Sequence, residues 1–340
     1  VIQQWGDLME VTGGALASDK TYWYLVEFVW KRGKWIAADS PLEFDLIAKT
    51  EDNNFVSLNQ LSCSTASEML GIWMAPNGSK TKMIQEMRTS AVEWGAKIRK
   101  GRPSQEEAWQ ALHSTIAAKL KYPLAACTFT EKECTSIMAP AIRAALPKSG
   151  ISRTMTTSVR DAPITSGGLG VPNLYKLMGT LRTALLVNQC WQKTPTRHLL
   201  HTCIEDMVLD TGLYGLLWHQ NFPAYSSWTS QHSWIYHVCA FNYAHEIRLN
   251  IEHAELKPRR EGDRSIMAVA YNHFNSAADL RAINRVRMLH GVVNISDITA
   301  ADGRKLDQVF LVSEAFEGTR NDYVWPSKHH VTPTDYTAWR

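Results

Sequence analysis

Hydrophobic positions in the middle of the chain recur with the period of a helix. Between residues 81 and 100 the apolar side chains of Met83, Met87, Trp94 and Ile98 lie four or seven positions apart, and polar residues occupy many of the other positions. Because an α-helix turns once in about 3.6 residues, this spacing places the apolar side chains on one face. The pattern predicts an amphipathic helix over 81–100.

Further helices follow from capping signals and periodicity. Ser104, with Glu107 three positions later, is typical of a helix start, and the helix is expected to run to about residue 121. Together with a helix over 131–145, these elements predict a small helical domain over 79–150. Later helices are predicted over 174–189, 234–251 and 277–289.

The first 78 residues have a different pattern. After a helix over 1–12, residues 22–30 are rich in aromatic and β-branched side chains, and a short polar turn separates them from Trp35 and Ile36, which predicts a β-hairpin. A second strand-rich stretch runs from 55 to 73. The fold class predicted is therefore α+β, with strands at the N-terminus, a helical domain, and an α-rich region over 151–340 that ends in a loop and strand over 295–310.

Composition bounds the class of protein. A chain of 340 residues with 45% hydrophobic residues can bury a full core in two or three domains. No apolar stretch approaches the roughly 18 residues of a membrane span, so we expect no membrane partner. Six scattered cysteines suit a reducing compartment, the cytoplasm or the nucleus. The chain begins at Val1 in the middle of a helical pattern, which favours a fragment.

Positive charge is concentrated between residues 80 and 160. The chain as a whole has a net charge of only +3, but this interval carries fourteen Lys and Arg against six Asp and Glu. Such a block is the electrostatic footprint of phosphate binding, although a charged helix face is also commonly just solvated. The candidate nucleic-acid contacts are Lys80, Lys82, Arg88, Lys97, Arg99, Lys100 and Lys119.

Two passages near the N-terminus carry a resemblance. The first is a glycine pair, Gly13-Gly14, followed by Lys20 just before a strand, and the second is Leu70-Gly71-Ile72-Trp73. Together they resemble the palm-to-thumb junction of reverse transcriptases of the non-LTR retrotransposon type. The resemblance implies that Lys20 lies near the incoming nucleotide and assists pyrophosphate departure. It also implies that the strand around Gly71 and Trp73 supports the primer end.

Two later passages extend the resemblance over most of the chain. Ser166-Gly167-Gly168-Leu169-Gly170 is similar to the glycine-rich stretch after the thumb of these elements, and a turn is its favoured role. Residues 282–287, with Ser296-Asp297-Ile298, are similar to a passage near their end.

The resemblance implies a division of the chain and a set of partners. Residues 1–78 would be the C-terminal edge of the palm, 79–150 the thumb, and 151–340 a region without an assigned role. The partners would be an RNA template, a DNA primer and the missing fingers and palm. The aromatic-X-Asp-Asp motif is absent. Because two-metal phosphoryl transfer needs those carboxylates, Mg²⁺ is expected only in the complete polymerase, and this chain alone is predicted to be inactive.

Two other classes of function stay open. One is a non-catalytic helical binding or scaffold protein derived from a decayed retroelement. The other is a metal hydrolase that uses His237, Cys239, His245 and His253, although their spacing matches no standard zinc pattern.

Overall fold

The structure is a computed structural model. It describes residues 11, 21–31, 34–41, 45–49, 54–213, 222–226, 228–229, 233–249, 260–300, 302–311 and 331–340. The chain forms two compact units, of which the first comprises Val1–Leu112 and Ser136–Arg153 and the second comprises His113–Thr135 and Thr154–Arg340. The helical domain predicted over 79–150 therefore contributes residues to both units.

The described strands all belong to the first unit. They are β1 (Tyr22–Trp23), β2 (Val26–Lys31), β3 (Lys34–Asp39), β4 (Ile47–Lys49), β5 (Phe55–Ser57), β6 (Asn59–Gln60), β7 (Ser67–Met69) and β8 (Ile72–Met74). They pair two by two, β1 with β6 in parallel and the other pairs as antiparallel hairpins. The predicted first hairpin is confirmed as β2–β3, with Val26 opposite Asp39.

A carboxylate connects the end of β3 to the segment that precedes β7. The side chain of Asp39 accepts hydrogen bonds from the backbone N–H of Cys63, at 2.5 Å, and from the hydroxyl of Ser62, at 2.8 Å. These bonds stabilise the charged form, and they lower the pKa of Asp39. Two short hairpins distant in sequence are thereby linked by a side chain.

The helices of the first unit follow the predicted pattern. The helix expected over 81–100 is α2 (Thr81–Lys100), which buries Met83, Met87, Ala91 and Gly95. A Cβ atom at Gly95 would lie 3.0 Å from the carbonyl oxygen of Pro140, so glycine permits the close approach of α2 and α5 (Glu131–Lys148).

The next predicted helix starts where its capping signal indicates. Helix α3 (Gln105–Ala111) begins with a capping box, in which the Ser104 hydroxyl accepts from the N–H of Glu107 at 3.2 Å and the Glu107 carboxylate accepts from the N–H of Ser104 at 2.7 Å. The helical path then widens into a π-helical turn, η1 (Leu112–Ala117), before α4 (Ala118–Lys121) and the 3₁₀ turn η2 (Tyr122–Ala125). The division between the two units falls at this wide turn.

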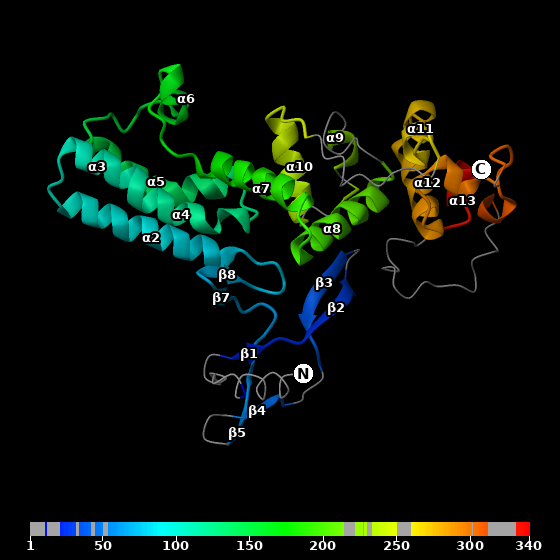
Figure 1. Ribbon diagram of the computed structural model, residues 1–340, viewed down its shortest axis with the longest axis horizontal. Helices are drawn as coiled ribbons and strands as arrows, with labels where there is room; N and C mark the ends of the chain where they lie inside the picture. Colours follow the sequence, from blue (N-terminus) through cyan, green and yellow to red (C-terminus); the bar gives the residue numbers. More distant parts are fainter. Residues whose placement is uncertain are drawn as a thin grey trace. The chain divides into compact units, whose positions relative to one another are not determined.

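The described part of the second unit is helical (Figure 1). Besides α4, η2 and the start of α5, its elements are α6 (Thr157–Asp161), η3 (Ile164–Ser166), α7 (Leu174–Cys190), α8 (Pro195–Thr211), α9 (Phe222–Tyr225), α10 (Trp234–Ala244), α11 (Ile266–His273), α12 (Ala277–His290), η5 (Ile295–Ile298), η6 (Gln308–Leu311) and α13 (Asp335–Trp339). Apolar side chains of α7, α8 and α10 form one core, and those of α11 and α12 form another.

Two predictions for this unit are corrected. The helix expected over 234–251 ends at Ala244, because Glu246 adopts a left-handed conformation with φ of +55°. The strand expected within 295–310 is wrong, because η5 and η6 occupy the two ends of that stretch and, among its described residues, only an isolated bridge pairs Thr299 with Leu306. The α+β class itself is confirmed.

Among the residues that the structure describes, no helix has both the length and the apolar character needed to cross a membrane.

Candidate functional site

The strongest candidate site is the surface formed by the β7–β8 hairpin and helix α2, called here the hairpin–helix surface. Met69 pairs with Ile72, so Leu70 and Gly71 form a two-residue turn. Their φ angles are +50° and +80°, the signs of a type I′ turn. The leucine is costly in this conformation, and its side chain is 89% exposed. An apolar side chain therefore projects from a strained hairpin tip.

Trp73 holds this hairpin against the first turn of α2. Its backbone N–H donates to the sulfur of Met83 at 3.3 Å. The Nζ atom of Lys82 lies 4.8 Å from the centroid of the Trp73 ring, within the range of a cation–π contact. The predicted contact residues Gly71, Trp73 and Lys82 are thus brought together.

Two exposed arginines lie on one flank of α2. Arg88 and Arg99 are separated by eleven positions, or about three helical turns, so they point in nearly the same direction. A line of two cations about 16 Å apart, at 1.5 Å per residue, is suited to contact two phosphates of one backbone.

The lysines of α2 occupy the other flank together with acidic residues. At about 100° per residue, this flank carries Lys82, Lys97, Lys100, Glu86 and Glu93. The Nζ atom of Lys82 is 2.6 Å from a carboxylate oxygen of Glu86. Three lysines and two glutamates give this flank a net charge of only +1. The basic face expected from the sequence is therefore divided between two flanks. The arginine flank is the one whose positive charge is not offset by glutamates of α2.

The remaining predicted contacts are dispersed. Lys80 is half-buried at the start of α2, whereas Lys119 is exposed on α4 in the second unit. Lys20, the predicted catalytic residue, lies outside the described residues, as does the helix predicted over 1–12 except for Val11.

Those of the proposed metal ligands that the structure describes are not gathered into a site. His237 and Cys239 lie on α10, and burial raises the pKa of the Cys239 thiol. The ring of His245 packs 4.4 Å from that of Phe241, centroid to centroid, and His253 is outside the described residues. Within the described parts of the chain, no group of three or more His, Cys, Asp or Glu side chains is arranged to hold a metal ion.

The glycine-rich passage that extends the resemblance forms a compact turn. Gly167 and Gly170 have positive φ angles, and a Cβ atom at Gly168 would overlap the carbonyl of Ala162. Backbone bonds such as that from the N–H of Leu169 to the carbonyl of Val159, at 3.0 Å, close the turn. The predicted turn is confirmed.

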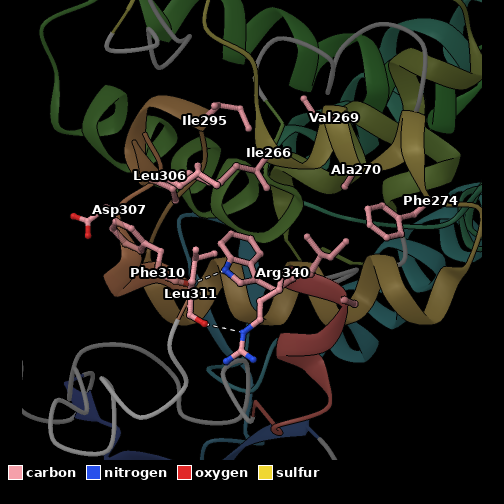
Figure 2. Close-up of a pocket in the computed structure, with 14 residues that line it drawn as sticks. Ile266, Val269, Ala270, Phe274, Ile295, Leu306, Asp307, Phe310, Leu311 and Arg340 are labelled. Atoms are coloured by element: carbon pink, nitrogen blue, oxygen red, sulfur yellow. Dashed lines mark hydrogen bonds between the residues drawn. The ribbon is translucent and has the colours of Figure 1, made fainter. Parts of the chain in front are cut away.

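A pocket of about 250 Å³ lies in the second unit, among α11, α12, η6 and α13 (Figure 2). Its walls are mainly apolar, with Ile266 and Phe310 among them. The indole N–H of Trp339 donates to the carbonyl of Phe310 at 2.7 Å, and Arg340 donates to that of Leu311 at 2.9 Å. Sequence reasoning missed this pocket because its walls come from segments far apart in the chain.

A second cavity that the sequence did not indicate surrounds Arg182 on α7. No periodicity or spacing distinguishes this arginine from the others in the chain.

Comparison with family models, with curated proteins and with solved structures finds no match for this chain.

Proposed function

We propose that this chain is part of an RNA-directed DNA polymerase of a retrotransposon and contributes primer and template binding. The observation that supports the proposal most is the hairpin tip, where Leu70 is kept at positive φ and almost fully exposed beside a basic helix. Residues held in a strained conformation are enriched at functional sites. In this proposal the tip contacts the primer end, and the first unit contains the palm edge and much of the thumb.

Each residue of the hairpin–helix surface then has a role. Gly71 lets the nucleic acid approach the turn, and Trp73 with Lys82 holds the hairpin on α2. Arg88 and Arg99 contact backbone phosphates, which requires no base recognition. Lys20 assists the departure of pyrophosphate, and Mg²⁺ is held by carboxylates of the missing palm, so the chain alone does not polymerise.

Charge reversal of the arginine flank tests the proposal. The full chain is titrated with a fluorescent RNA–DNA primer–template at several salt concentrations, in the wild type and in Arg88→Glu/Arg99→Glu. Loss of two phosphate contacts should reduce the slope of log K against log[salt] by roughly 1.4–1.8. Arg281→Glu, at an exposed arginine of α12, is the matched control and should leave the slope unchanged. Equal slopes in all three proteins would reject the proposal.

The rival is a non-catalytic helical binding or scaffold protein from a decayed retroelement. The glutamates on the lysine flank of α2 favour it, because they weaken attraction for a polyanion. The genomic sequence upstream of Val1 distinguishes the two classes. An in-frame aromatic-X-Asp-Asp motif supports the polymerase, and a start codon without that motif supports the scaffold.

A further inference from the structure

We propose that the cavity around Arg182, between the start of α5 and helices α7 and α10, binds a small monocarboxylate of two to four carbons. This site lies in the second unit, and it does not depend on the function proposed for the hairpin–helix surface. The inference begins with the surroundings of one guanidinium group.

Arg182 is a buried cation with few hydrogen-bond acceptors around it. The residue is only 2% exposed. Its Nη2 atom donates to the thioether of Met178 at 2.8 Å, a weak acceptor, and its Nε atom is buried without a hydrogen-bond partner. Leaving a buried charged donor unsatisfied is costly, so a native structure that keeps one needs an explanation.

No carboxylate of the described residues forms an ion pair with this guanidinium. The groups that raise its pKa are Cys127, Cys134 and Tyr175, whose side chains carry a charge only when they are deprotonated. Burial is the dominant influence, and it lowers the pKa of Arg182 to about 10. The group is thus still protonated at neutral pH, and it lacks a counter-ion.

The guanidinium lines a cavity of about 170 Å³, large compared with the roughly 10–15 Å³ that accommodates one water. Phe129 and Phe241 supply apolar walls. A Cβ atom at Gly179 would overlap the Phe241 ring, so this glycine allows the wall to approach α7. The cavity therefore combines apolar walls with a polar side, where Thr130 and His237 lie, and with one buried cation. This combination suits a ligand that has a short hydrocarbon part and a single negative group.

The charges around the cavity favour a monoanion over a dianion. One guanidinium is neutralised by one carboxylate, and its planar fork matches the two carboxylate oxygens. Glu131 lies at the exposed edge of the cavity, where it would repel the second charge of a phosphate. The half-buried Tyr175 stays protonated, because burial and Glu131 raise its pKa, and it is available as a further donor.

The test measures the melting temperature of the full chain in acetate, propionate, butyrate, phosphate or chloride at equal ionic strength. At ten times its Kd, a carboxylate should raise the wild-type Tm by about 2–4 °C relative to chloride. Calorimetric titration with propionate then gives the Kd. Ala240→Leu, which places a larger side chain in the wall while keeping the arginine, should abolish the shift.

The arginine itself is tested by Arg182→Met, with Arg281→Met on the exposed face of α12 as the control. Removing an uncompensated buried charge should leave Tm in chloride unchanged or higher, so that the variant folds, and the carboxylate shift should vanish. Arg281→Met should keep the full shift. An equal shift in Arg182→Met, or one in phosphate as large as in propionate, overturns the proposal.

Glu131→Gln separates a bound ligand from an internal partner. If Glu131 is the counter-ion in solution, this change lowers Tm in chloride and no carboxylate binds to the wild type, which also overturns the proposal. If the cavity takes an external carboxylate, Glu131→Gln strengthens propionate binding by removing a repulsive charge.

Discussion

The guanidinium of Arg287 donates a hydrogen bond to the carbonyl of Leu209, and this bond ties helix α12 to the end of α8. Arg287 is fully buried, like Arg182, but its donors are satisfied by the carbonyl of Val292 at 2.9 Å and by the side-chain oxygen of Asn284. The two buried arginines of this unit thus have opposite environments.

Arg287→Met is expected to lower the free energy of unfolding by about 3–5 kcal/mol, because it leaves two buried carbonyls and the Asn284 oxygen without donors. Denaturant unfolding followed by circular dichroism measures this loss. Arg182→Met, the matched change at the uncompensated arginine, should cost little. Similar losses in the two variants would mean that Arg182 has partners in solution.

At the hairpin tip, Leu70→Asn is expected to raise the free energy of unfolding by about 1 kcal/mol. Asparagine tolerates a positive φ better than leucine does, and Asn-Gly is the preferred pair for a type I′ turn. If Leu70 contacts nucleic acid, the same variant binds the primer–template more weakly. A variant that is less stable than the wild type contradicts the turn assignment.

Two neighbouring glycines are expected to differ in their tolerance of alanine. At Gly168 a Cβ atom would overlap the carbonyl of Ala162. At Gly167 a Cβ atom would have open space around it, but the backbone φ of +78° is unfavourable for alanine. Gly168→Ala should therefore cost about 2–3 kcal/mol and Gly167→Ala about 1 kcal/mol. Thermal unfolding of both variants gives the comparison, and the reverse order would show that the turn is wrongly described.

The stability of the second unit should depend on pH through His290. Burial lowers the pKa of this histidine to about 4 from 6.5, so between these values the unfolded chain binds more protons than the folded chain. The contribution of the neutral His290 to the free energy of unfolding is complete above pH 6.5 and is lost as the pH falls towards 4. The imidazole Nε2 lies 3.3 Å from the Tyr336 hydroxyl, a contact that glutamine can replace.

His290→Gln should reduce the loss of unfolding free energy between pH 6.5 and 4, as measured by urea unfolding at a series of pH values. Part of the loss should remain, because burial also lowers the pKa of His113 and His201. His273→Gln, at an exposed position of α11, is the control and should retain the wild-type slope. The pKa of the Asp335 carboxyl is lowered mainly by its hydrogen bonds with Arg285. Protonation of this group therefore changes the stability only below about pH 4, outside the range in which the two variants are compared.

The passage over 282–287 shows how a resemblance and a structural role can coincide. Asn284 and Arg287 are buried and bonded to the end of α8, and Arg285 pairs with Asp335 at 2.5 Å. These residues support helix packing in the second unit. A sequence pattern cannot separate such a role from a functional one, because polar residues on a helix look alike until their partners are known.

Local chemistry was enough to predict the elements that depend on neighbouring residues. The span of α2, the capping box at Ser104 and the β2–β3 hairpin all follow from interactions within a few positions, where side-chain type and backbone preference act directly. The contacts between residues far apart in the sequence were decided only by the tertiary structure. Whether Arg182 or Arg287 finds acceptors depends on which helices come together, because burial and charge pairing are properties of packed surfaces.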